Sequence, residues 1–241
     1  MLFTDIIIVG AGIIGLSIAK ELSSRYPDLK IIVLEKENGF AKHASGRNSG
    51  VLHAGFYYSP DSLKARFTVE GNQLLTEYCL THDLPINRCG KVVVAKDEKE
   101  LETLYELKRR GDKSGVKLEI IDDNQLKELE PNAKTYQKAL FSPTTSSVNP
   151  TRVVEHIGSN LIKKKAIDIL FNENFIKKEN SNCIGTNKQK INFKYLINTA
   201  GLYADKVGHK FGVGYQYTLV PFKGLYIGYT DDSLINRHIY P

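Results

Sequence analysis

The first 35 residues carry two short runs of apolar side chains, and these runs predict two strands. Ile6 to Val9 and Ile31 to Leu34 are rich in β-branched residues and contain no polar position. Strands that are buried on both faces of a parallel sheet have this composition. The residues between the two runs begin with glycines and continue as a helix. The pattern therefore predicts a strand, a turn, a helix and a second strand.

Further along the chain, apolar residues recur at the spacing of helices and of strands in turn. Ser62 can cap a helix, and Asn149-Pro150 places a capping side chain before a proline at the first helical position. We expect helices over 62–83, 97–113, 122–129 and 150–165. We expect strands or extended chain over 51–58, 86–95, 117–121, 139–148, 166–171, 174–179, 190–196 and 218–229.

The order of these elements predicts an α/β fold with two domains. Residues 1–84 and 146–215 supply parallel α/β units, which together form a discontinuous Rossmann-like domain. Residues 85–145 and 216–241 supply an inserted domain with a mostly antiparallel sheet. The last residues, 237–241, are expected to lie within that inserted sheet.

The turn after the first strand has the glycine spacing of a dinucleotide-binding site. Gly10 permits the tight turn, Gly12 lets the backbone approach a pyrophosphate, and Gly15 lets the helix pack close to the strand. Glu35 ends the second strand, 20 residues after Gly15, where a carboxylate can bind ribose hydroxyls. That carboxylate would repel the 2′-phosphate of NADP. FAD and NAD both remain open on this evidence.

Composition limits the class of protein. The hydrophobic content of 41% and charged content of 25% are ordinary for a soluble globular chain, and no apolar run is long enough to span a membrane. A signal peptide is not expected, since no basic segment precedes the first apolar run. The net charge of +6 comes from dispersed lysines without a nucleic-acid motif, although peripheral contact with an anionic membrane stays open. Three cysteines without a C-x-x-C pair indicate a reduced, cytoplasmic setting and no structural metal.

A series of local motifs resembles the FAD-dependent D-amino-acid-oxidase (DAO) superfamily and, within it, the L-2-hydroxyglutarate oxidase/dehydrogenase family. The most specific is the block NSGVLHAG at 48–55 with Tyr57-Tyr58 after it. The other matching residues, in chain order, are His43, Gly46, SLKA at 62–65, CGK at 89–91, Val94-Ala95, EPN at 130–132, AGLYAD at 200–205 and PFKG at 221–224. The chain departs from the family pattern at Arg47, Lys223 and Leu225, and it lacks the family's C-terminal part. The substrate domain is therefore expected to be truncated.

The resemblance implies FAD as the cofactor and assigns residues to its binding. Short side chains and free N–H groups in the loop after the second strand suit the pyrophosphate and the edges of the flavin ring. Ala200-Gly201 follow a second strand, where ligands of open α/β sheets bind. The expected FAD-binding residues are Gly10, Gly12, Ile13, Ile14, Gly15, Glu35, Lys36, His43, Ser45, Asn48, Ser49, Gly50, Ala200 and Gly201.

The same resemblance implies oxidation of a 2-hydroxy acid, most simply L-2-hydroxyglutarate to 2-oxoglutarate, by hydride transfer to FAD. A base must take the hydroxyl proton, and the imidazole of His53 suits that task near neutral pH. Lys223 is expected to pair with a substrate carboxylate and Tyr57 to donate a hydrogen bond, although Tyr57 can also simply pack. The electron acceptor would be oxygen or a membrane quinone.

Two alternatives remain on the sequence alone. The chain can be another enzyme of the superfamily, such as a glycerol-3-phosphate dehydrogenase or an amino-acid oxidase. It can also be an inactive flavin-binding fragment, whose incomplete sheet leaves strand edges and apolar surface exposed.

Overall fold

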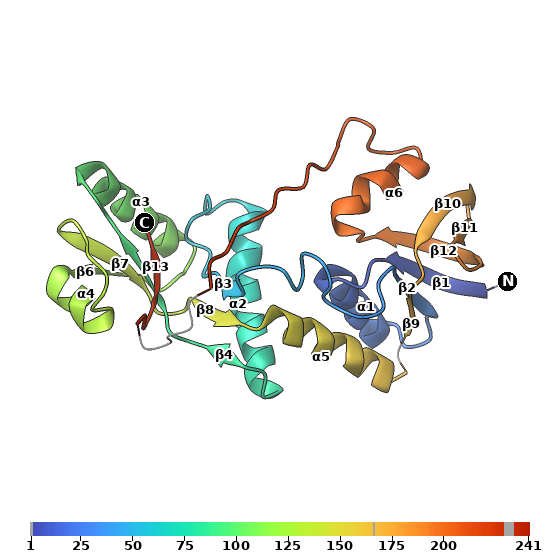
Figure 1. Cartoon of the computed structure of the whole chain (residues 1–241), viewed down its shortest axis with the longest axis horizontal. Helices are drawn as coiled ribbons and strands as arrows, with labels where there is room; N and C mark the ends of the chain where they lie inside the picture. The colour runs from blue at the N-terminus through green and yellow to red at the C-terminus, as the bar shows by residue number, and fades with distance from the viewer. Residues whose placement is uncertain (1, 166, 229–233) are drawn as a thin grey trace. The chain divides into compact units, whose positions relative to one another are not determined.

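The computed structural model describes residues 2–165, 167–228 and 234–241. The chain forms two compact units (Figure 1). Unit 1 consists of Met1–Asn48 and Pro150–Leu225, and unit 2 consists of Ser49–Asn149 and Tyr226–Pro241. These bounds differ from the predicted ones mainly over residues 49–84, which belong to unit 2. The assignment of one domain to the cofactor and the other to the substrate stays a prediction.

Unit 1 is built on a six-stranded sheet with β1 near its middle. β1 pairs in parallel with β12 and β2, and β2 pairs in parallel with β9. β10 and β11 form an antiparallel hairpin that continues the sheet beyond β12. In sheet order the strands are β10 (Phe175–Asn180), β11 (Cys183–Thr186), β12 (Lys190–Asn198), β1 (Leu2–Val9), β2 (Ile31–Glu35) and β9 (Asp168–Phe171). The parallel centre confirms the predicted Rossmann-like fold.

Helices cover this sheet, which explains why Ile6–Val9 of β1 and Ile31–Leu34 of β2 are apolar. Neighbouring residues Ile7 and Ile8 point to opposite faces, and both are fully buried. On the face of Ile7, the side chain of Val207 from α6 (Ala204–Lys210) joins the core. α1 (Ile13–Arg25) packs against β1 and β2 and beside α5 (Pro150–Lys163).

In its described residues, unit 2 contains two small sheets and three helices (Figure 1). All their strand pairs are antiparallel except β13 with β5, which is parallel. One sheet has the order β13 (His238–Tyr240), β5 (Lys91–Val94), β7 (Lys138–Ser142) and β6 (Glu119–Asp122). The other has the order β3 (Val51–Leu52), β8 (Ser146–Val148) and β4 (Ile86–Asn87). The presence of β13 confirms that residues 237–241 enter the sheet of the insertion.

Alternating side chains of β5 pack on the two faces of the four-stranded sheet. Val93 joins a core that Leu104 of α3 (Glu98–Lys113) also enters. Val92 joins the opposite core, to which α4 (Asp123–Leu129) contributes Leu126. Both helices begin at an aspartate whose side chain accepts backbone N–H groups of the first turn. The third helix of the unit is α2 (Leu63–Thr81).

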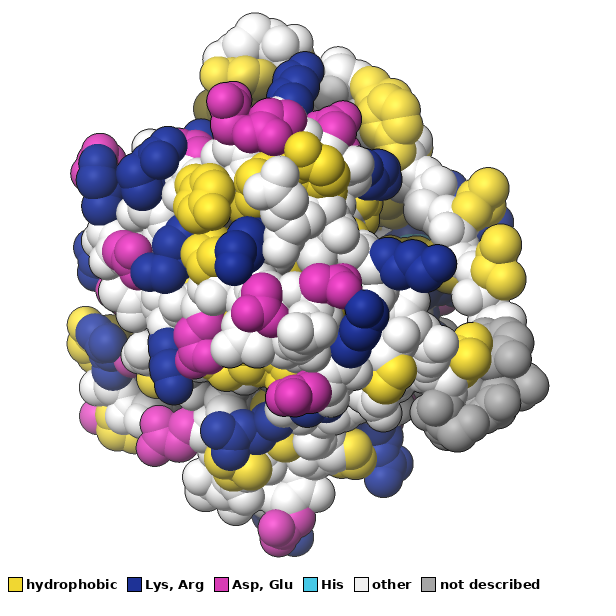
Figure 2. Space-filling view, turned by 90° about the vertical axis from the view of Figure 1, so that its left-hand side faces the viewer, with side chains coloured by type: hydrophobic (Ala, Val, Ile, Leu, Met, Phe, Trp, Pro, Cys, Tyr) yellow, Lys and Arg dark blue, Asp and Glu magenta, His cyan; other side chains and the backbone are white. Residues whose placement is uncertain are grey.

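The face of the molecule in Figure 2 carries lysines and arginines interspersed with acidic side chains. In α3, Lys108 and Arg110 each lie one turn from an acidic partner, Asp112 and Glu106 respectively. Exposed pairs of this kind contribute about 1 kcal/mol at most. On the face in Figure 2, basic and acidic side chains are mixed, so no patch of a single sign forms there. The expected absence of a nucleic-acid partner stays a prediction.

The structure confirms the predicted helices, which are α1 to α5, and corrects three predicted strands. The predicted strand 51–58 ends at Leu52, because Gly55 has a φ of +102° and begins a turn in which the Tyr58 N–H donates to the Gly55 carbonyl. Gly90, with a φ of +77°, divides the predicted strand 86–95 into β4 and β5. The strand β11 was not predicted at all.

Residues 218–228 contain no strand, although their apolar pattern predicts one. Position 229, the end of that predicted strand, lies outside the described residues. No strand in the described part of the chain pairs with this segment. Its apolar side chains instead face solvent, with Phe222 93% and Ile227 100% exposed. A strand is stable only when a neighbour takes up its backbone hydrogen bonds and its apolar face.

Candidate functional site

The glycine turn of unit 1 has the shape that a dinucleotide requires. Gly10 has a φ of +109°, and a Cβ at this position would lie 2.5 Å from the Thr199 carbonyl oxygen. Gly15 faces the Gly10 carbonyl so closely that a Cβ there would overlap it. The Thr199 hydroxyl donates to the carbonyls of Val9 and Gly10 at 3.0 and 3.1 Å. The carboxyl ends of β1 and β12 are thereby joined at the start of α1.

The N-terminus of α1 and the end of β2 converge on this turn. Gly12 caps the helix without a side chain, and the Ser45 hydroxyl instead accepts the Ile13 N–H at 3.0 Å. The Glu35 carboxylate accepts the Ala11 N–H and the Glu37 N–H, each at 3.0 Å. The glycine turn therefore holds the Glu35 carboxylate and the N-terminus of α1, with its partial positive charge, at the same edge of the sheet.

Most of the remaining predicted cofactor residues of unit 1 lie in two loops. In one, His43 Nε2 lies 2.7 Å from Glu37 Oε1, a contact that lowers the pKa of Glu37. Lys36 lies over the ring of Tyr203, and Asn48 donates to the Ala44 carbonyl. In the other loop, the Ala200 N–H is bound by the Asn198 side chain, and Gly201 has a φ of +54°. Ile14 is 65% exposed on the first turn of α1.

In unit 2, the segment after β3 carries His53 and Tyr57, and two side chains fix its backbone. The buried Asn72 of α2 donates to the carbonyls of Leu52 and His53 at 3.1 and 3.2 Å. Arg110 of α3 donates to the Tyr57 carbonyl at 3.2 Å. The predicted Ser49 and Gly50 precede β3, and Gly50 turns the chain with a φ of +70°.

The imidazole of His53 is half-buried beside aromatic rings. Its ring meets that of Tyr240 edge-on, with centroids 6.3 Å apart. Burial lowers the pKa of His53, and the charges of Lys91 and His238 lower it further. Burial also raises the pKa of Tyr57 to about 12, so this phenol keeps its proton throughout the neutral range. His53 is therefore suited to accept a proton and Tyr57 to donate a hydrogen bond.

Lys91 lies beside the rings of Tyr57 and Tyr240 and is fully buried. Its Nζ lies 4.3 Å from the ring centroid of Tyr240, 4.5 Å from that of Tyr57 and 5.0 Å from that of Phe56. No hydrogen-bond partner for this nitrogen occurs in the described part of the chain. The Tyr57 hydroxyl and His238 Nε2 are likewise buried and unpartnered there.

Lys223, the predicted carboxylate ligand, lies in the exposed segment 218–228, in the part that belongs to unit 1. Its role stays a prediction.

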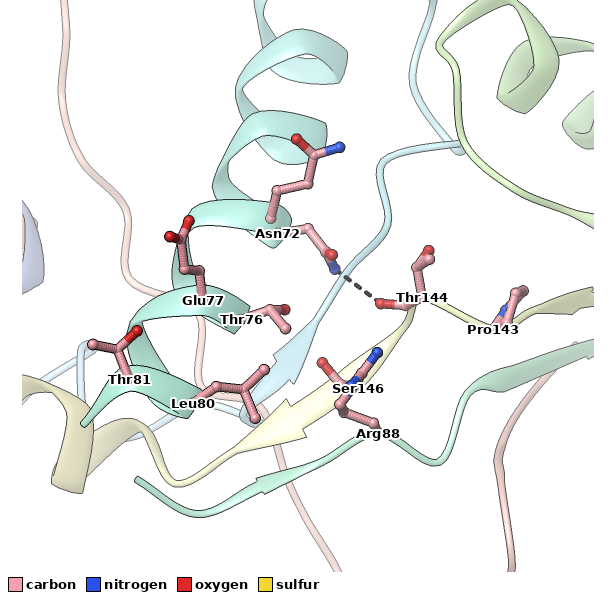
Figure 3. A pocket seen from close by; sticks show the side chains of 10 residues that line it. Asn72, Thr76, Glu77, Leu80, Thr81, Arg88, Pro143, Thr144 and Ser146 are labelled. Atoms are coloured by element: carbon pink, nitrogen blue, oxygen red, sulfur yellow. Dashed lines mark hydrogen bonds between the residues drawn. The ribbon is translucent and has the colours of Figure 1, made fainter. Parts of the chain in front are cut away.

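A hollow of about 390 Å³ in unit 2 lies between α2, β4 and β8 (Figure 3). Asn72, Arg88 and Ser146 are among its lining residues, and Asn72 donates across it to the Thr144 carbonyl at 3.1 Å. None of the sequence-predicted site residues lines this hollow. Asn72 therefore connects the hollow to the backbone of His53 without placing the imidazole in it.

Residues 5–241 match the model of the FAD-dependent oxidoreductase (DAO) family. The chain belongs to this family.

Relatives of known name support the narrower resemblance. The chain is 37% identical to mitochondrial L-2-hydroxyglutarate dehydrogenase of Nematostella vectensis, over 98% of this chain and 56% of the relative. It is 34% identical to L-2-hydroxyglutarate dehydrogenase of Escherichia coli O17:K52:H18 (strain UMN026 / ExPEC), over 98% of this chain and 57% of the relative. The chain thus spans a little over half the length of the curated relatives it matches.

Solved structures have the same fold. L-α-glycerophosphate oxidase from Mycoplasma pneumoniae with FAD bound has a TM-score of 0.77 and 26% identity, over 87% of this chain and 57% of that one. Glycine oxidase from Geobacillus kaustophilus has a TM-score of 0.78 and 19% identity, over 89% of this chain and 60% of that one. The second likeness shows the fold alone.

The residues of unit 1 fit the FAD of this DAO family. The turn leaves no room for side chains at Gly10 and Gly15, so its backbone stays open to a pyrophosphate. Backbone N–H groups hold the Glu35 carboxylate at the strand end, where a ribose would lie. FAD therefore agrees with both the family and the shape of the turn.

Sequence reasoning missed several residues that shape the site of this DAO-family chain. Asn72 gives no signal in sequence, because its three acceptors are backbone carbonyls from distant segments. Thr199 lies beside the predicted Ala200 and carries the contact between the strand ends. Lys91 had a detectable signal, since the alternation in β5 places it on the same face as the buried Val93. Among the described residues, no group of three metal-binding side chains occurs, and no helix is long and apolar enough to cross a membrane.

Proposed function

We propose that the enzyme to which this chain belongs oxidises a 2-hydroxy acid, with L-2-hydroxyglutarate as substrate and 2-oxoglutarate as product. The observation that carries this proposal is the half-buried imidazole of His53, whose lowered pKa keeps it neutral and able to take a proton. The relatives named L-2-hydroxyglutarate dehydrogenase, at 34–37% identity over nearly all of this chain, support the substrate.

Oxidation of a secondary alcohol removes a hydride from carbon and a proton from the hydroxyl. When bound, FAD supplies the acceptor for the hydride. His53 takes the hydroxyl proton, and Asn72 holds the His53 backbone in place for that transfer. Tyr57 remains protonated and donates a hydrogen bond to a substrate oxygen. Lys223 pairs with a substrate carboxylate as a single point charge.

Most of the residues that hold FAD in this proposal belong to unit 1, and Ser49 and Gly50 belong to unit 2. Gly10, Gly12, Ile13, Ile14 and Gly15 enclose the pyrophosphate at the start of α1. Further contacts come from Glu35, Lys36, His43, Ser45, Asn48, Ser49, Gly50, Ala200 and Gly201. Oxygen or a quinone is the proposed electron acceptor. We place the enzyme in the cytoplasm, where its net charge of +6 favours contact with an anionic membrane surface.

The first test is anaerobic addition of L-2-hydroxyglutarate to the FAD-loaded protein, with the flavin absorbance followed at about 450 nm. Bleaching by the L-isomer, but not by the D-isomer or by amino acids, is the expected result. His53→Gln should slow the bleaching by about 10²- to 10⁴-fold, the usual contribution of a general base, while FAD remains bound. A flavin that no 2-hydroxy acid bleaches would contradict the substrate assignment.

Glycerol 3-phosphate is the second candidate substrate. The observation that favours it is the likeness to the oxidase from Mycoplasma pneumoniae at 26% identity. The same bleaching experiment with glycerol 3-phosphate in place of L-2-hydroxyglutarate separates the two candidates, because only the true substrate should bleach the flavin. The third reading, an inactive fragment, is favoured by the exposed apolar segment 218–228 and predicts weak FAD binding and aggregation.

A further inference from the structure

The strand pairing of unit 2 places a lysine and two polar aromatic side chains on one face of a sheet. Lys91 in β5 is the register partner of His238 in β13, and Val93 is the partner of Tyr240. Side chains two residues apart in a strand point the same way, so all four lie on one face. That face also packs against Phe56 and the helix α3. Lys91 therefore points into an apolar core and not toward solvent.

The short strand β13 is held against β5 by a buried carboxylate. Glu130, which is fully buried, accepts the backbone N–H groups of Asn236 and Arg237 at 2.6 and 2.8 Å. The His238 N–H donates to the Gly90 carbonyl at 3.2 Å, next to Lys91 in sequence. These contacts fix His238 and Tyr240 beside the lysine.

A buried ammonium group that lacks a hydrogen-bond acceptor is costly, and proteins seldom retain one without use. Three aromatic rings compensate part of the cost through cation–π contacts at 4.3 to 5.0 Å. The same rings exclude water, so the charge of Lys91 is poorly screened. Its field therefore reaches the two nearby imidazoles, His53 and His238.

We infer that Lys91 is a positioning residue for His53: the two side chains contact the same Tyr240 ring, and the buried positive charge of Lys91 adds to the effect of burial in keeping the His53 imidazole able to accept a proton. This inference rests on the proposed role of His53 as the base. Lys91 itself touches neither the substrate nor the reacting atoms in this account. It acts at a distance, through the low dielectric of the core.

The other charged and titratable groups around His53 reinforce the effect or leave it unchanged. His238 from β13 also opposes a proton on His53. Tyr57 is a neutral phenol in this range. Arg110 and Arg109 of α3 share one partner, Glu106, at 2.8 and 2.6 Å, so this group keeps one net positive charge, of the same sign as that of Lys91. The two charged groups that lower the pKa of His53 are Lys91 and His238, and both carry a positive charge when they are protonated.

The direct test is an NMR titration of the six histidines, with ¹⁵N-labelled imidazoles followed from about pH 4 to about pH 9. His53→Gln assigns the His53 signal. Lys91→Met removes the charge and retains most of the volume, and Lys91→Arg retains the charge. Lys96→Met removes an exposed lysine near the end of the same strand as a matched control.

The titration midpoints of His53 and His238 should move to higher pH in Lys91→Met and should stay low in Lys91→Arg and Lys96→Met. In the FAD-loaded enzyme, the acid limb of kcat/KM should move in the same direction in Lys91→Met only. A folded Lys91→Met protein with an unchanged His53 midpoint would overturn the inference, and so would an equal change in Lys91→Arg.

A second measurement covers the case in which Lys91→Met does not fold. In the wild-type chain with ¹³Cε-labelled lysines, one signal should titrate near pH 8, the value to which burial lowers the pKa of Lys91, and Lys91→Arg should remove that signal. If every lysine titrates near its ordinary pKa, about 10.4, the inference fails. These titrations need no substrate. A loss of flavin bleaching with intact midpoints would thus contradict the proposed function and leave the charge coupling standing.

Discussion

The hydroxyl of Ser45 accepts a hydrogen bond of 3.0 Å from the backbone N–H of Ile13. This contact joins the loop after β2 to the first turn of α1, at the position where a helix N-terminus would meet a pyrophosphate. Gly12, the residue that caps α1, has no side chain to do this. One hydroxyl from a distant loop therefore completes the start of the helix.

Replacement of Ser45 should weaken both the loop and the flavin site. Ser45→Ala removes the acceptor of the Ile13 N–H, which costs about 1 kcal/mol, or roughly fivefold in FAD affinity. The measurement is an FAD titration by fluorescence quenching. Ser17→Ala, an exposed position of the same helix, should bind FAD as the wild-type chain does. Equal affinity of the two variants would show that Ser45 does not contribute to the cofactor site.

Gly90 should tolerate a side chain less well than another glycine of similar backbone conformation. Gly90 and Gly115 have φ values of +77° and +71°, so alanine costs both about 1 kcal/mol in backbone strain. A Cβ at Gly90 would also lie 2.8 Å from the Phe141 ring, whereas at Gly115 it meets open space. Urea unfolding should therefore show a larger loss for Gly90→Ala, by about 1–3 kcal/mol. Equal losses would mean that strain alone governs both positions.

The sequence was sufficient for the centre of unit 1 and for the long helices. The apolar run at 6–9, the glycines and the acid at position 35 depend only on local order, and each predicted element formed. The segments that failed depend on distant partners. Residues 218–228 have the pattern of a strand but find no neighbour in the described part of the chain. The strand β11 was missed because it forms only through pairing with β10 and β12.

The candidate site likewise contains residues that a local pattern predicts and residues that only distant partners bring together. Gly10, Gly12, Gly15 and Glu35 could be assigned because the dinucleotide motif encodes their spacing in one continuous stretch. Lys91 and Tyr240 are 149 positions apart in the chain, and only the pairing of β13 with β5 brings them together. No local pattern could have identified that pair.

The exposed apolar residues of segment 218–228 should contribute little to the stability of this chain. Phe222, Leu225 and Ile227 are 93%, 87% and 100% exposed, so the triple change to serine should alter the unfolding free energy by no more than about 0.5 kcal/mol per site. It should lower binding of the dye ANS and slow aggregation, both measurable on the purified chain. Leu140→Ser, in a fully buried position, should destabilise by about 3 kcal/mol or more. A large loss in the triple variant would show that the segment packs against the chain in solution.

Removal of the buried charge at Lys91 should stabilise the fold. Burial lowers the pKa of Lys91 from 10.5 to about 8, so the folded state holds the ammonium less favourably than the unfolded state does. The difference corresponds to on the order of 3 kcal/mol, and cation–π contacts that methionine cannot make offset part of the gain. Lys91→Met should therefore be more stable than the wild-type chain at neutral pH by about 1–3 kcal/mol.

The pH dependence separates this cause from better packing. Below about pH 8 the lysine is charged in both states, and the full cost is present. As the pH rises from about 8 toward 10.5, the folded state loses its proton first, and the wild-type chain gains stability. Urea unfolding of both proteins at several pH values should show the advantage of Lys91→Met shrinking across this range. An advantage that stays constant with pH would mean that methionine merely packs better, and that the charge of Lys91 carries no cost.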